Sequence, residues 1–203
     1  MQWGPVAEAL VLLGGTFALA YGLGISTLWL VIPTLWLTFT NRSLAAYGIG
    51  RGVPQGIGFH VVVSIAIFVP YLIGHALLAS MFWGARFQPT MPEDMGWAVL
   101  QHVFLIALPE EVFFRGYLQT QIDRASTRRW RVLGAEVGVG WVASSVLFGA
   151  CHIFNGGPAR LVTAFPGLWY GWLRARTGNV WVPALYHAAS NLLMKFMVAS
   201  LQP

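Results

Sequence analysis

Three short stretches of this 203-residue chain place ionisable and amide side chains in otherwise apolar sequence. They are residues 109–115, 148–152 and 187–191, which contain two glutamates, an arginine, two histidines and an asparagine. A carboxylate and an imidazole can together take a proton from water, and further N–H donors can stabilise the oxyanion that forms when this water attacks a carbonyl. The three stretches therefore hold the side chains needed to hydrolyse a peptide bond without a covalent intermediate.

Helical geometry separates the two neighbouring glutamates. Residues four apart lie on one face of a helix, whereas neighbours are turned by about 100° from each other. Glu111 and Arg115 are four apart and are expected to form an ion pair that neutralises both charges locally. Glu110 then faces another direction and has no cation near it in the sequence. The spacing predicts that Glu110 is the carboxylate left free for chemistry.

The other two stretches have the same spacing of four. His187 and Asn191 are expected to aim an imidazole and an amide into one cavity, and Phe148, one turn before His152, is expected to wall that cavity. Because burial makes a carboxylate a stronger base, we expect Glu110 with His152 to activate water. His187 and Asn191 would donate hydrogen bonds to the oxyanion in a site of low dielectric.

The composition indicates which elements position these side chains. Hydrophobic residues make up 57% of the chain and charged residues only 9%, against about 25% charged residues in a soluble domain. Stretches of roughly 20 mostly apolar residues, the length of a membrane-spanning helix, follow one another almost throughout. We predict an all-α fold, a polytopic transmembrane helical bundle with about seven spans (six to eight) in a single membrane domain, residues 1–203. The expected spans are residues 6–23, 25–40, 57–83, 97–120, 135–154, 160–175 and 180–201.

The depth of the candidate residues follows from the helical rise. At 1.5 Å per residue, Glu110 lies roughly 15 to 18 Å from the inner end of its span and Asn191 roughly 16 Å from the inner end of the last span. These two side chains can therefore meet. His152 lies nearer the outer end of its helix, and it reaches the same depth only if that helix starts later or is tilted.

The basic residues describe the topology. The net charge of +5 arises mainly from arginines in residues 41–56, 119–131 and 174–179, which all fall on one side of a seven-span bundle. Such connections are typical of cytoplasmic loops, so we expect the N-terminus inside and the C-terminus outside. The charge therefore indicates topology and not nucleic-acid binding. Cys151 is the only cysteine, which excludes an intramolecular disulfide and a cysteine-rich metal site.

The three stretches read Glu-Glu-x-x-x-Arg, Phe-x-x-x-His and His-x-x-x-Asn, in that order and on separate expected helices. In these motifs, over about residues 97–195, the chain resembles the CPBP family of CAAX proteases and bacteriocin-processing enzymes. The resemblance implies a glutamic intramembrane endopeptidase with catalytic helices in that range. It implies that Glu110 activates water, that Glu111 and Arg115 support it, that His152 is the second partner of the water, and that His187 with Asn191 forms the oxyanion hole.

The resemblance leaves the substrate open, because members are associated with prenylated CaaX proteins, peptide and bacteriocin maturation, immunity, and C-terminal sorting tails. The chain is short for the family, so we expect substrate recognition within the bilayer or at its edge. The expected partners are a membrane-anchored protein or peptide substrate and the lipid bilayer, with no nucleic acid. We expect no cofactor, and a multi-pass location in the membrane of a prokaryotic cell.

Other interpretations of the individual residues stay open. Glu110, Glu111 and Arg115 can be a structural ion network that fixes helix packing, and Cys151 can be a thiol nucleophile. One glutamate and two histidines with an open position would also suit zinc. The His-Glu-x-x-His spacing of many zinc proteases is absent, however, and Asn191 is a poor zinc ligand.

Two other classes of protein compete with an enzyme. In a proton-coupled membrane transporter, Glu110, His152 and His187 would form a proton relay across the bilayer. Such carriers typically have an internal repeat and paired broken helices, and the sequence has no internal repeat. A non-enzymatic membrane scaffold or immunity protein would tolerate the loss of Glu110.

Overall fold

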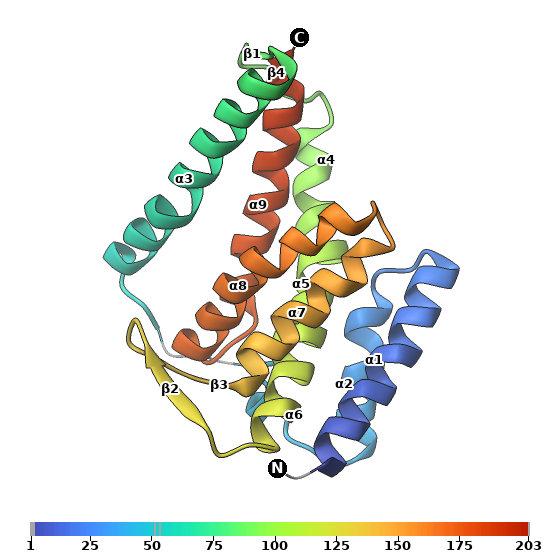
Figure 1. Ribbon diagram of the computed structural model, residues 1–203. Coiled ribbons are helices and arrows are strands. Elements are labelled where there is room, and N and C mark those ends of the chain that lie inside the picture. Colours follow the sequence, from blue (N-terminus) through green and yellow to red (C-terminus); the bar gives the residue numbers. More distant parts are fainter. Residues whose placement is uncertain (1–2, 51, 53, 203) are drawn as a thin grey trace.

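The computed structural model describes residues 3–50, 52 and 54–202 and is 76% helical, which confirms the all-α prediction (Figure 1). The only strands in the described residues form two small antiparallel pairs: β1 (Arg86–Phe87) with β4 (Leu201–Gln202), and β2 (Arg129–Val132) with β3 (Ala135–Gly138). The main helices are α1 (Trp3–Leu23), α2 (Leu28–Phe39), α3 (Ile57–Trp83), one continuous helix over Met95–Arg124, α7 (Val139–Ile153), α8 (Ala164–Thr177) and α9 (Trp181–Ser200), with short 3₁₀ turns at Leu44–Tyr47 and Pro158–Thr163.

Among the described residues, three helices are long and apolar enough to cross a membrane: α1, α3 and Met95–Arg124. The apolar helices α2 and α7 are shorter. In α3 only Val63 and Ala79 are buried, although its sequence is apolar around its whole circumference. A helix that exposes apolar side chains on every face fits lipid as its surroundings and not water. The number of spans stays a prediction.

The helix Met95–Arg124 lies in the middle of the molecule, between the hairpin of α1 and α2 on one side and α3 and α9 on the other (Figure 1). Its two π-helical segments, η2 (Gln101–Ala107) and η3 (Val112–Leu118), lie on either side of the short α-helical stretch that contains Glu110. Turns of π-helix are rare and often occur at functional sites. The segments of this helix are α4 (Met95–Leu100), η2 (Gln101–Ala107), α5 (Leu108–Glu111), η3 (Val112–Leu118) and α6 (Gln119–Arg124).

Pro109 connects this helix to the N-terminal hairpin. Proline has no backbone N–H, so the carbonyl of Leu105 lacks its α-helical donor. The hydroxyl of Ser26, in the turn between α1 and α2, donates a hydrogen bond to this carbonyl. The proline therefore frees a carbonyl that binds the turn between α1 and α2, and this contact lies close in the helix to the two glutamates.

The span expected at residues 135–154 is a helix only from Val139, so its expected start is wrong. The preceding residues form a hairpin in which β2 (Arg129–Val132) pairs with β3 (Ala135–Gly138). Residues 133–134 connect the strands with positive φ angles of 45° and 76°, as a two-residue hairpin turn of type I′ requires. The apolar stretch from which the span was predicted therefore includes residues that the backbone places in a strand.

The three arginine-bearing connections lie at one end of the molecule, together with α6, β2 and the start of α1, as the sequence predicts (Figure 1). They are the described residues of 41–56, 119–131 and 174–179; Arg51 lies outside the described residues. The C-terminal end of α9 lies at the opposite end, beside β1.

A single carboxylate ties α1 to its neighbours at this end. Glu8 accepts two hydrogen bonds from Arg42, at 2.6 and 2.7 Å, and one from Trp36 at 2.9 Å. It also accepts hydrogen bonds from Tyr117 at 2.7 Å and Gln121 at 2.6 Å, both on the long central helix. Because all five donors converge on one carboxylate, its removal would take away the carboxylate partner of a half-buried guanidinium and of three other polar groups.

We expect Glu8→Ala to destabilise the protein by about 2 kcal/mol, since hydrogen bonds to a charged group are lost together with an ion pair. Thermal unfolding of the detergent-solubilised protein, followed by circular dichroism, measures this loss. Glu93→Ala is the matched control, because Glu93 is exposed and has no ion pair within the described part of the chain. Equal melting temperatures for the two variants would contradict the prediction.

Candidate active site

The two neighbouring glutamates point in different directions, as their spacing predicts. The side chain of Glu111 has no solvent exposure, whereas that of Glu110 is 16% exposed and lines a cavity. Glu110 Oε2 is a buried atom without a hydrogen-bond partner among the described residues, so the exposed part of the side chain lies elsewhere on it. Glu110 is thus the carboxylate that a water molecule or a substrate can reach.

Glu111 forms the expected ion pair with Arg115. The distance from Arg115 Nε to Glu111 Oε2 is 3.3 Å, and neither side chain is exposed. The guanidinium carbon lies 4.6 Å from the ring centre of Phe148 and 5.8 Å from those of Phe114 and Tyr170. The aromatic faces therefore share the stabilisation of the buried cation with the carboxylate.

His187 lies between the two glutamates. Its Nδ1 is 3.0 Å from Glu111 Oε1, and its Nε2 is 3.8 Å from Glu110 Oε2. The imidazole stacks on Tyr170 at 4.9 Å between ring centres, and the Tyr170 hydroxyl donates to Ser190 Oγ at 2.8 Å. These contacts fix the plane of the imidazole and direct its second nitrogen towards Glu110.

His152 is positioned by its own helix. Its Nδ1 lies 2.8 Å from the carbonyl oxygen of Phe148, and because a carbonyl can only accept, Nδ1 carries the hydrogen. In the neutral imidazole this leaves the Nε2 lone pair free to accept a proton. α7 starts at Val139, later than expected, and His152 lines the same cavity as Glu110. A later start of this helix is one of the two conditions under which, from the sequence, His152 is expected to reach the depth of Glu110.

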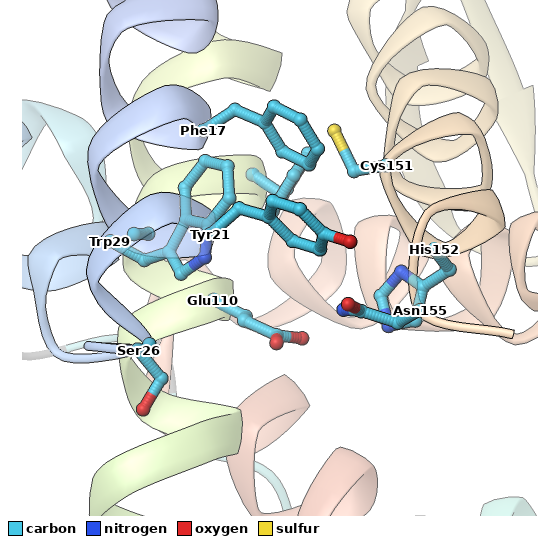
Figure 2. A pocket seen from close by; sticks show the side chains of 11 residues that line it. Phe17, Tyr21, Ser26, Trp29, Glu110, Cys151, His152 and Asn155 are labelled. Atoms are coloured by element: carbon cyan, nitrogen blue, oxygen red, sulfur yellow. The ribbon is translucent and has the colours of Figure 1, made fainter.

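The cavity has a volume of about 280 Å³ and lies between the N-terminal hairpin, the central helix and the end of α7. Figure 2 shows the carboxylate of Glu110 extending towards His152 and Asn155 on the opposite wall. The lining residues are Phe17, Ala20, Tyr21, Gly24, Ser26, Trp29, Glu110, Phe114, Cys151, His152 and Asn155.

Not every predicted site residue lies at this cavity. His187 and Asn191 are not among the residues that line it, and within the described residues Asn191 makes no hydrogen bond with Glu110. Phe148 is buried, with its ring 4.4 Å from that of His152 and 5.7 Å from that of His187, so it packs between the histidines and does not form the cavity wall. Cys151 lines the cavity, but its sulfur points away from Glu110 (Figure 2).

Sequence reasoning missed one wall of the cavity. Phe17, Tyr21 and Trp29 come from α1 and α2, far from the motifs in the sequence, and nothing in their local pattern indicates a site. Asn155 follows α7, and its sequence context, Asn-Gly-Gly-Pro, is typical of a turn. The polar character of Asn155 beside His152 is the one signal available for it.

The residues present do not fit a three-ligand metal site. In the described part of the chain, no three His, Cys, Asp or Glu side chains come close enough together to hold a metal ion. Glu110 and His152 lie at the cavity, while His187 Nδ1 is engaged with Glu111. These side chains therefore do not converge on one metal position.

Comparison with protein-family models matches residues 92–193 to a family described as Type II CAAX prenyl endopeptidase Rce1-like. The match covers just over half of the chain and confirms the resemblance read from the three motifs. All the candidate site residues predicted from the sequence lie within it, whereas α1, α2 and α3 lie outside it. Searches of curated proteins and of solved structures each returned no match.

We expect Arg115→Met to destabilise the protein by about 3 kcal/mol or more, because it leaves the carboxylate of Glu111 buried without its cation. The double variant Arg115→Met/Glu111→Gln should be more stable than Arg115→Met, since it removes the unpaired charge. Thermal unfolding in detergent measures both, with exposed Arg128→Met as the control. A double variant that is less stable than Arg115→Met would argue against a coupled buried pair.

Proposed function

Since the chain belongs to the type II CAAX prenyl endopeptidase Rce1-like family, we propose that it hydrolyses a peptide bond near the membrane surface in a lipid-anchored or membrane-inserted protein. The family and the apolar helices make it an integral membrane protein. We further propose that it is a multi-pass protein of a prokaryotic cell membrane. Its partners would be its membrane-anchored substrate and the bilayer. The bond that it cleaves would be in a CaaX-like terminus or a C-terminal sorting tail.

One observation carries the proposal: Glu110 and His152 face one cavity from two different helices. Glu110 brings a partly exposed carboxylate that lines the cavity, and His152 brings an imidazole whose Nδ1 is already committed to a carbonyl. A water molecule between a carboxylate and a free imidazole nitrogen can be both held and deprotonated. Neither a transporter nor a scaffold requires this arrangement.

In the proposed reaction the oxygen of this water bonds to the carbonyl carbon of the substrate, and its proton passes to Glu110. His152 holds the water through its free nitrogen. When the C–N bond breaks, Glu110 returns the proton to the departing amide nitrogen, which leaves a new carboxyl group and a new amine. No covalent enzyme intermediate forms, and Cys151 takes no part.

The oxyanion of the tetrahedral intermediate requires N–H donors. We assign this role to His187 and Asn191, as the family resemblance implies, with the imidazole of His187 oriented by Glu111. Glu111 and Arg115 are proposed to support the site by holding His187 and by leaving Glu110 free. A preorganised donor of this kind is worth most where water is excluded.

We expect Glu110→Gln to lower the cleavage rate at least about 100-fold, because the amide cannot accept the proton of water. The assay uses proteoliposomes with two reporters, a farnesylated CaaX peptide and a fusion protein with an apolar C-terminal tail. Glu93→Gln, an exposed glutamate outside the cavity, is the control and should retain activity. Undiminished cleavage by Glu110→Gln would sink the assignment of the base and favour the transporter or scaffold interpretations.

We also expect cleavage by the wild-type protein to survive prolonged dialysis against a zinc chelator, since no step in the proposed mechanism uses a metal. The rates before and after dialysis are compared on the same proteoliposomes. Loss of activity that zinc restores would overturn the metal-independent mechanism, although not the endopeptidase activity.

A further inference from the structure

We propose that Asn155 is a substrate-contacting residue of this site, whose side-chain amide donates a hydrogen bond to the carbonyl oxygen of the scissile peptide bond. The inference rests on the proposed function and adds a donor to it. Neither the spacing of the three motifs nor the description of the matched family assigns a role to this residue.

Asn155 lies in the turn that follows α7, three residues after His152. Its amide occupies the wall of the cavity beside His152, opposite the carboxylate of Glu110 (Figure 2). A peptide bond in this space has Glu110 on one side and His152 with the amide of Asn155 on the other. The position suits a group that contacts the carbonyl under attack.

The backbone around Asn155 is held in place while its side chain is free. The Asn155 N–H donates to the carbonyl of His152 at 3.0 Å, and the hydroxyl of Tyr21 donates to the carbonyl of Phe154 at 3.3 Å. The Phe154 ring also lies 5.0 Å from that of Phe17 on α1. The amide of Asn155 makes no hydrogen bond within the described residues. The turn thus presents an unused donor on a fixed backbone.

The other hydroxyl and amide groups near the site are occupied or lie elsewhere. Tyr21 and Ser26 line the cavity, but both hydroxyls already donate to backbone carbonyls. His187 and Asn191, the donors implied by the family resemblance, do not line it. The indole of Trp29 belongs to the aromatic wall of the N-terminal hairpin, whereas Asn155 supplies an amide N–H on the same wall as His152.

The test compares Asn155→Ala and Asn155→Asp with the wild type on the two reporters in proteoliposomes. Both variants remove the N–H donor, and the aspartate keeps the shape of the side chain. Asn41→Gly is the control, because Asn41 is an exposed amide far along the chain from the cavity and its positive φ of 53° suits glycine. Inhibition by a peptidyl aldehyde, whose hydrate resembles the tetrahedral intermediate, is measured in parallel.

We expect kcat to fall about 100-fold in both variants, as for the loss of one oxyanion donor, while KM and the melting temperature change little. Affinity for the aldehyde should fall by the same factor as kcat/KM. Wild-type kcat in either variant, or a change in KM alone, would overturn the role of Asn155 and leave the proposed function intact. Wild-type protein that cleaves neither reporter would refute the proposed function, and this role with it.

Discussion

An ion pair without solvent exposure on either partner organises the polar groups around His187 in the candidate site. Burying a carboxylate and a guanidinium costs more than their attraction returns unless further contacts satisfy them. Here Glu111 faces Arg115 and also contacts His187, while aromatic rings cover the guanidinium. The pair engages one of two adjacent glutamates, whereas the other, Glu110, has a partly exposed side chain that lines the cavity.

The chemical groups and the walls of the cavity come from different parts of the chain. The family match contains Glu110 and His152, whereas the aromatic wall of Phe17, Tyr21 and Trp29 belongs to the N-terminal hairpin outside it. Three sets of contacts hold that hairpin: the cluster around Glu8, the Ser26 hydroxyl on the carbonyl exposed by proline, and the Tyr21 hydroxyl on the turn after α7. The residues proposed for the chemistry therefore lie inside the family match, and the aromatic wall lies outside it.

Local features of the sequence predicted those parts of the structure that depend on neighbouring residues alone. The composition gave the helical class, and a spacing of four gave the pairing of Glu111 with Arg115. Contacts between segments that are far apart in the sequence could not be predicted. The periodicity of apolar residues does not indicate the aromatic wall, and the sequence around Asn155 indicates only a turn. The hairpin before Val139 was missed because its two-residue turn interrupts an apolar pattern that also suits a helix. Glu8 did carry a signal, since a lone carboxylate in an apolar helix needs partners.

The central claim is that water, held by Glu110 and His152, attacks the substrate within the cavity without a covalent intermediate. The most direct test is a structure of the protein bound to a peptidyl aldehyde. The account predicts a hydrated aldehyde carbon in the cavity, with one hydroxyl within hydrogen-bond distance of both Glu110 and His152. An aldehyde carbon bonded to the sulfur of Cys151, or an inhibitor bound away from Glu110, would contradict it.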